Sequence, residues 1–208
     1  MRILVTGFEP FGNDSENASI RAVNLLDERW SDDDPVQLVT GELPVVFGAA
    51  GSALFELAAR YRPDAVIAVG EAGGRSAVTP ERVAVNNMDA RIPDNAGRQP
   101  VGEQIFETGG DRHSRLDIDA LADAITATGV ASEVSEDAGR FVCNYVAFVA
   151  YGLDVPAAFV HVPAVRSAGA ATVGAETDAG VPGVSDLTIE EISDALEAAV
   201  REVARQVA

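Results

Sequence analysis

The sequence contains no lysine and only one cysteine, and both shortages restrict what the protein can be. Against 33 acidic residues stand 15 basic ones, all arginine, which gives a formal net charge of −18 over 208 residues. A surface this acidic repels nucleic acid and anionic membranes, so we expect neither as a partner. The acids are spread along the chain, with one short cluster at 32–34, which favours a surface adapted to the high-salt cytoplasm of a halophile over an acidic tail.

A single cysteine excludes an internal disulfide, which agrees with a reducing compartment. No apolar run approaches the ~20 residues of a membrane-spanning helix, and Met1 leads directly into a strand-like stretch without a signal-peptide pattern. The two histidines lie far from the cysteine and show no metal-ligand spacing. We therefore expect a cytoplasmic protein that needs no metal or other cofactor.

Alternating strand and helix patterns run along the chain and predict an α/β fold. The apolar runs 2–6, 65–70 and 157–163 are typical of strands buried on both faces of a sheet. Further strands are expected at 36–46 and 131–135, and helices at 17–30, 47–61, 116–128, 143–151 and after Thr188. With no repeat or linker, residues 1–208 are predicted to form one domain, a three-layer α/β/α sandwich around one twisted, mostly parallel mixed sheet.

Two irregular segments carry side chains suited to a functional site. The loop 7–12 combines two glycines, a proline and two aromatic rings directly after the first predicted strand. The stretch 70–102 is long, rich in glycine and turn residues, and follows the most apolar strand. Open α/β sheets place their sites beyond the carboxyl ends of such strands, so we expect part of an active site there.

Cys143 lies where an apolar, strand-like stretch changes to a helical pattern. A lone cysteine is more often a small buried apolar residue than a nucleophile. In the first turn of a helix, however, the dipole and the backbone N–H groups would favour a thiolate and could stabilise an oxyanion. His161 ends a buried strand and suits a core residue or a catalytic base equally well, whereas His113 in a polar loop is expected at the surface.

Six short motifs together resemble the pyroglutamyl-peptidase I family, in the same order and spacing. They are TGFEPFG at 6–12, GGR at 73–75, PERVA at 80–84, DARIPDN at 89–95, FVCN at 141–144 and FVHVP at 159–163. The resemblance extends from the first loop to the histidine strand and leaves mainly the last forty or so residues without support.

The resemblance implies a cysteine exopeptidase that removes an N-terminal pyroglutamyl residue from peptides through a thioester acyl-enzyme. It implies that Cys143 is the nucleophile, His161 the general base and then acid, and Glu81 the carboxylate that orients the histidine. Arg91 resembles the family arginine beside the catalytic centre, where it would help to hold the oxyanion; the alternative is a structural ion pair. A homotetramer or homodimer is also implied.

By the same resemblance, an apolar pocket receives the flat, uncharged lactam ring. Its side chains correspond to Phe8, Phe11, Ile92, Phe141 and Val142. Glu71 stands where the family usually has glutamine; a carboxylate also accepts a hydrogen bond from the ring N–H but adds a negative charge. Two further departures are Ala18 in place of a proline and an unfamiliar continuation after Pro163.

Other functions remain compatible with parts of the sequence. Without the resemblance, Glu81 would be one acid among 33 and read as a surface carboxylate. Another thiol or acyl-transferring enzyme on the same scaffold would keep Cys143 and His161 but change the aromatic loop. An enzyme similar to nucleoside phosphorylases would use the glycines at 73–74 in a phosphate site and would not need Cys143.

Overall fold

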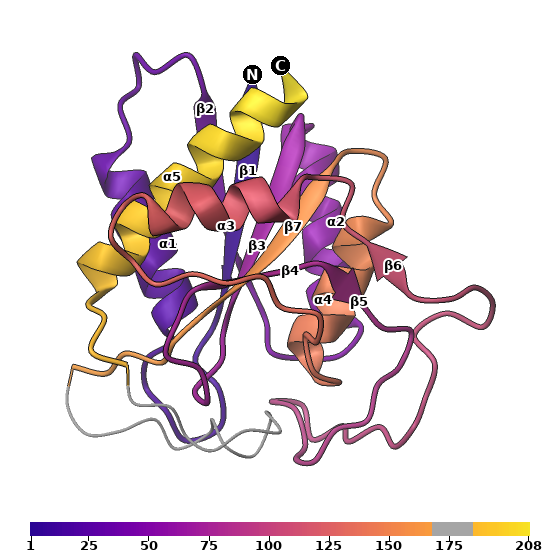
Figure 1. Cartoon of the computed structure of the whole chain (residues 1–208). Coiled ribbons are helices and arrows are strands. Elements are labelled where there is room, and N and C mark those ends of the chain that lie inside the picture. The colour runs from indigo at the N-terminus through magenta and orange to yellow at the C-terminus, as the bar shows by residue number, and fades with distance from the viewer. Residues whose placement is uncertain (168–184) are drawn as a thin grey trace.

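The computed structural model describes residues 1–167 and 185–208 and has a five-stranded sheet at its centre (Figure 1). The strand order is β2-β1-β3-β7-β4. Four strands are parallel, namely β1 (Arg2–Phe8), β2 (Gln37–Leu43), β3 (Ala65–Glu71) and β7 (Ala157–Val162), whereas β4 (Thr79–Glu81) runs antiparallel to β7. Two short antiparallel strands, β5 (Val83–Ala84) and β6 (Arg112–His113), form a separate ribbon. The predicted mostly parallel mixed sheet is confirmed.

Helices cover both faces of the sheet, which confirms the three-layer sandwich (Figure 1). One apolar core lies between the sheet and α1 (Ala18–Arg29), α3 (Ile118–Thr126) and α5 (Ile189–Val207). The other lies between the sheet and α2 (Ala49–Tyr61) and α4 (Val142–Tyr151). Because both faces of β3 and β7 are covered, these strands are apolar almost throughout. In the part of the chain that the structure describes, no helix is long and apolar enough to cross a membrane.

The helix ends follow the expected capping chemistry. The Asn17 side chain caps α1 by accepting a hydrogen bond from the Ser19 N–H. Thr188 and Glu191 form a reciprocal capping box at the start of α5. In contrast, Phe141 precedes α4 without any side-chain cap, so the first-turn N–H groups of α4 face the loops at the carboxyl edge of the sheet.

The strand predicted at 131–135 is wrong. Ser132 and Ser135 make only isolated bridges, to Val78 and Glu81. The edge that they could extend is β4, which has three residues, and its central Pro80 has no N–H to donate. Strand β6 was not predicted, and its His113 is exposed as expected. The stretch 164–185 is rich in glycine, alanine, serine and threonine and is predicted from its sequence to be a loop; it lies mostly outside the described residues.

Candidate active site

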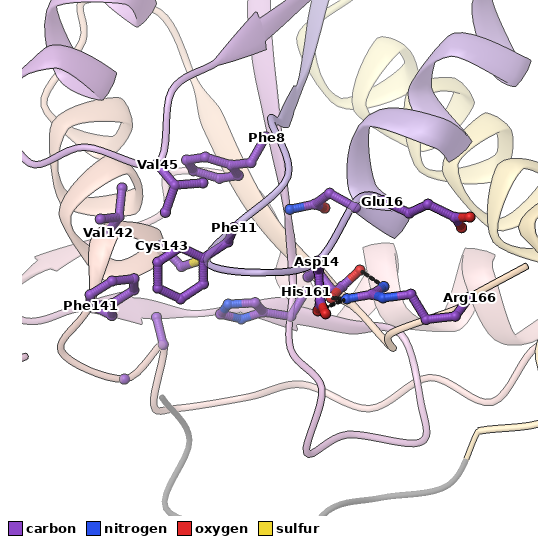
Figure 2. Close-up of a pocket in the computed structure, with 14 residues that line it drawn as sticks. Phe8, Phe11, Asp14, Glu16, Val45, Phe141, Val142, Cys143, His161 and Arg166 are labelled. Carbon is purple, nitrogen blue, oxygen red and sulfur yellow. Dashed lines mark hydrogen bonds and ion pairs between the residues drawn. The ribbon is translucent and has the colours of Figure 1, made fainter. Parts of the chain in front are cut away.

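A pocket opens at the carboxyl ends of β1, β3 and β7, beside the start of α4 (Figure 2). Its cavity volume is about 50 Å³. Since a single water needs about 10–15 Å³ by this measure, the pocket has room for a small ring but not for a long side chain. Cys143 and His161 both line it, as the sequence predicted.

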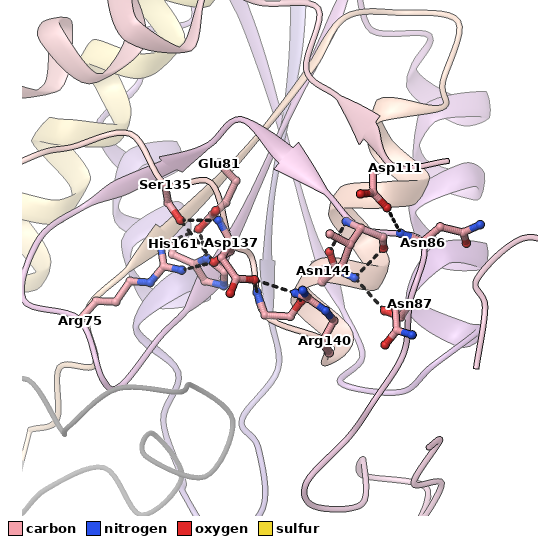
Figure 3. A network of polar contacts seen from close by, with 12 residues as sticks. Arg75, Glu81, Asn86, Asn87, Asp111, Ser135, Asp137, Arg140, Asn144 and His161 are labelled. Carbon is pink, nitrogen blue, oxygen red and sulfur yellow. Dashed lines mark hydrogen bonds and ion pairs between the residues drawn. The ribbon is translucent and has the colours of Figure 1, made fainter. Parts of the chain in front are cut away.

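His161 and Glu81 form a buried pair in neighbouring antiparallel strands (Figure 3). The His161 Nδ1 atom lies 2.7 Å from Glu81 Oε1, and the side chains are 3% and 0% exposed. A carboxylate that accepts from Nδ1–H fixes the tautomer in which Nε2 can take a proton. The geometry therefore gives Glu81 the orienting position that the family resemblance implied.

The Arg75 guanidinium also reaches the Glu81 carboxylate. Arg75 Nη1 lies 2.5 Å from the same Oε1 atom, and Arg75 also donates to the Thr79 hydroxyl and to the Asp137 carbonyl. Burial opposes ionisation of Glu81, but the hydrogen bond and charge of His161, followed by the charge of Arg75, hold its pKa below the usual 4.5. The structure thus favours the carboxylate form.

Cys143 is the second residue of α4, at the amino end of the helix. Its sulfur packs against Gly70, because a Cβ atom on that glycine would come within 2.9 Å of Cys143 Sγ and 2.8 Å of Phe159 Cζ. Gly70 lies opposite His161 in the register of β3 and β7. The absence of a side chain at Gly70 therefore leaves the space that the thiol occupies next to the histidine strand.

Aromatic and aliphatic side chains form one wall of the pocket. Phe8, Phe11, Phe141 and Val142 line it as predicted, together with Val45. The ring centroids of Phe11 and Phe141 are 5.1 Å apart, which holds the two rings as one surface.

The predicted motif at 89–95 anchors this wall. Asp94 accepts from the Phe47 N–H at 2.9 Å, and the Asn95 side chain donates to the Glu9 carboxylate and the Pro10 carbonyl of the aromatic loop. Arg91 is exposed, Ile92 is partly buried against the apolar core, and neither lines the pocket. Their roles in the oxyanion site and in ring binding stay predictions.

The opposite wall is charged, which the expectation of an apolar pocket missed. It is formed by Asp14, Glu16, Asn17, Glu71 and Arg166. Arg166 donates to both oxygens of Glu71, at 2.6 and 2.7 Å, and to Asp14 at 2.6 Å. The Ala18 N–H donates to Glu71 at 2.6 Å. A carboxylate at the end of β3 is thus compensated by one arginine and by the first N–H group of α1.

With this geometry in place, comparison with known proteins gives a consistent result. A family model described as pyroglutamyl peptidase matches residues 1–206. The chain belongs to this family. The pyrrolidone-carboxylate peptidase of Vibrio parahaemolyticus is 42% identical over 170 residues, 78% of either chain.

Solved structures of the same family have the same fold as this chain. The crystal structure of Bacillus amyloliquefaciens pyroglutamyl peptidase I has a TM-score of 0.84 and 33% identity, over 99% of this chain and 98% of the other. A mutant pyrrolidone carboxyl peptidase from the hyperthermophile Pyrococcus furiosus has a TM-score of 0.85 and 32% identity over 100% of both chains. The family resemblance and the fold class are confirmed.

Sequence reasoning gave no role to three side chains of the site. Arg75 and Asn144 lie inside motifs that carried the resemblance, which was the available signal for them. Asn144 binds the backbone of Val85 and Asn87 and ties their loop to α4 (Figure 3). Arg166 had no motif to mark it.

The three departures from the family pattern, at residue 71, at residue 18 and after Pro163, lie close together in the structure. Glu71, the Ala18 N–H and Arg166, which follows the histidine strand, are in direct contact. A proline at position 18 would have no N–H to offer to Glu71.

Proposed function

We propose that this member of the pyroglutamyl peptidase family hydrolyses the amide bond after an N-terminal pyroglutamyl residue, with Cys143, His161 and Glu81 as its catalytic triad. The observation that carries the proposal is the buried His161–Glu81 pair at the pocket that Cys143 enters from the start of a helix. Nucleophile, base and orienting carboxylate then come from three separate elements, α4, β7 and β4.

The geometry suits a two-step acyl transfer. His161 Nε2 takes the proton from Cys143 Sγ, and the thiolate attacks the pyroglutamyl carbonyl carbon. The first-turn N–H groups of α4, which have no acceptor within the helix, stabilise the developing oxyanion. The intermediate collapses to a thioester as the imidazolium protonates the departing amine. His161 then deprotonates a water, whose attack releases pyroglutamate and restores the thiol.

Glu81 acts on the histidine throughout this sequence. Its carboxylate holds the Nδ1–H and stabilises the imidazolium that forms in each step. We further propose that Arg91 approaches the oxyanion and that Ile92 borders the ring when a peptide is bound.

The two walls of the pocket match the two chemical characters of the lactam ring. The apolar faces of the ring would contact Phe8, Phe11, Phe141 and Val142, and the ring N–H would donate to Glu71. An open-chain glutamate would have to place its charged side-chain carboxylate either against the apolar rings or beside the Glu71 carboxylate, which disfavours its binding. The substrates are therefore peptides whose N-terminus is cyclised.

The structure disfavours the nucleoside-phosphorylase-like alternative. Arg75, the cation of the GGR motif, holds Glu81, Thr79 and Asp137 rather than facing an open anion site. A phosphate ligand would have to break these contacts first.

A direct assay tests the proposed activity. We expect release of the chromophore from a pyroglutamyl amide in high salt, and we expect Cys143→Ser to lose at least about 10³-fold in kcat. The change from sulfur to oxygen keeps the shape of the side chain, so melting temperature should stay near that of the wild type. Ser132→Ala serves as a control outside the pocket. Equal activity of wild type and Cys143→Ser would refute the mechanism.

Three properties of the whole protein are also part of the proposal. We infer that residues 1–208 act as one peptidase domain in the cytoplasm of a halophile. We also infer assembly into a homo-oligomer, as the family resemblance implied, and the exposed Phe55, Val101 and Phe106 are the apolar side chains to test for burial between subunits. Light scattering after size-exclusion chromatography in 1 M salt tests this inference, and a monomer at micromolar concentration would contradict it.

A further inference from the structure

Arg166 is a buried side chain of the pocket wall that forms ion pairs with Glu71 and Asp14. Its side chain is 8% exposed, and its partners Glu71 and Asp14 are 10% and 7% exposed. Burial opposes the charge of Arg166, but the hydrogen bonds and charges of Glu71 and Asp14 raise its pKa further above the usual range. The guanidinium is therefore a permanent cation of the pocket wall.

The contacts of Arg166 constrain the orientation of one carboxylate. Its Nη1 and Nη2 atoms bind the two different oxygens of Glu71, so the carboxylate cannot rotate without breaking a charged hydrogen bond. Ala18 adds a third donor to Oε2. A bidentate arginine fixes direction as well as charge, which a single point contact would not do.

The remaining hydrogen-bonding capacity of Glu71 lies on its other oxygen. Among the described residues, Oε2 accepts from two donors and Oε1 from one. A carboxylate oxygen accepts about two hydrogen bonds, so Oε1 retains one acceptor position. Glu71 and Arg166 line the same pocket as Cys143, so a ring bound in that pocket lies beside the Glu71 carboxylate.

We propose that Arg166 is a positioning residue for substrate binding, which holds the Glu71 carboxylate in the orientation that accepts the N–H of the pyroglutamyl ring and balances its charge. This inference rests on the proposed peptidase activity. Without Arg166, Glu71 would be a buried carboxylate with no cation beside it and would turn toward solvent or toward other donors. Arg166 is needed because residue 71 is charged.

A double-mutant cycle tests this dependence. We expect Arg166→Gln to raise KM for a pyroglutamyl amide about tenfold and to leave kcat within about threefold. The reason is that the Glu71 contact with the ring N–H contributes to substrate binding and not to the chemical step. In the Glu71→Gln background, the same Arg166→Gln change should alter KM less than about twofold, because a neutral amide leaves no charge to balance. Arg29→Gln, which removes the exposed ion pair with Asp194, is the matched control.

A second variant tests the hydrogen bond from the Ala18 N–H to Glu71. Ala18 is the first residue of α1 and Asn17 has the extended backbone, φ −134° and ψ 122°, that a following proline requires. Ala18→Pro therefore fits the helix backbone, removes the N–H that binds Glu71 and places the proline Cδ atom where that hydrogen was. We expect KM to rise about threefold with the melting temperature maintained.

The outcomes separate this inference from the proposed function. If the wild type does not hydrolyse pyroglutamyl amides, the proposed function fails. If it does, but Arg166→Gln leaves KM unchanged or raises it equally in both backgrounds, only the positioning role is overturned. A fall in melting temperature alone would mark Arg166 as purely structural. Should Arg166→Gln not fold, Arg166→Lys keeps the charge but not the two-pronged contact with Glu71, and an unchanged KM in that variant would overturn the positioning role.

Discussion

One oxygen atom of Glu81 binds both the proposed base, His161, and the Arg75 guanidinium. Both His161 Nδ1 and Arg75 Nη1 bind Oε1, and the carboxylate is completely buried. A lone carboxylate at this depth would be protonated more readily than in water, and the interactions with His161 and with the Arg75 cation reverse that tendency. Arg75 therefore supports the orientation of His161 without lining the substrate pocket.

We expect Arg75→Gln to destabilise the protein by about 2 kcal/mol at pH 7, because a charged hydrogen bond to a buried carboxylate is weakened. The pKa of Glu81 is depressed in the folded state, so the stability it contributes is present above its unfolded value of 4.5 and is lost as pH falls through the folded pKa. Removing Arg75 raises that folded pKa. The difference between variant and wild type should thus be largest above pH 5 and shrink in acid, as measured by urea unfolding from pH 3 to 7.

Arg82→Gln is the control for this prediction. Arg82 follows Glu81 in the chain, but its ion pairs with Asp119 and Glu136 lie at the surface. We expect Arg82→Gln to lower the free energy of unfolding by less than about 0.5 kcal/mol, so that protonation of Asp119 and Glu136 in acid closes no measurable difference. A pH-independent loss in Arg75→Gln would show that the arginine contributes packing and not charge.

The residues of the site differ in how far the sequence could predict them. The local context of Cys143 and His161, a helix start and a buried strand end, marked them as candidates but left a core role open, and the family resemblance supplied their catalytic roles. Glu81 needed the family resemblance, because its burial comes from β4 pairing with β7 far along the chain. Arg166 meets Glu71 across 95 residues, a contact that no local pattern encodes.

At the scale of elements, α4 contacts two members of the proposed triad. Its amino end presents Cys143 to the pocket, and at its carboxyl end the buried Tyr151 hydroxyl donates to the Glu81 carbonyl at 2.6 Å. The apolar pattern predicted this helix and the buried strands, because both are covered on all sides. It failed at 131–135, where the backbone makes isolated bridges and the side chains give no reliable period.

Helix α5 provides a prediction on stability alone. Thr188 caps the helix through the Glu191 N–H, and the helix packs on the sheet face away from α4. We expect Thr188→Ala to lower the free energy of unfolding by about 1 kcal/mol, whereas Thr188→Ser keeps the hydroxyl and should cost much less. KM and kcat on a pyroglutamyl amide should be unchanged in both. A changed KM would mean that the two faces of the sheet are coupled.

For the whole molecule, the negative charge and the buried ion pairs respond differently to salt. The ion pairs Arg166–Glu71 and Arg75–Glu81 are largely buried, so dissolved salt screens them little. The excess acids lie mainly at the surface, where a net charge of −18 on 208 residues causes self-repulsion. Salt should therefore act on global stability and leave the geometry of the site unchanged.

We expect the melting temperature to rise by more than about 3 °C between 0.1 and 1 M potassium chloride, because the Debye length falls from about 10 to 3 Å and the repulsion is screened. Asp32 and Asp33 are exposed, and neither forms an ion pair within the described part of the chain. Replacing both with asparagine reduces the magnitude of the negative net charge by two, from −18 to −16, so the double variant should start from a higher melting temperature in 0.1 M salt and gain less on going to 1 M. Since KM depends on the buried wall of the pocket, it should stay within about twofold across the same range. Equal melting temperatures at both salt concentrations would contradict an adapted surface.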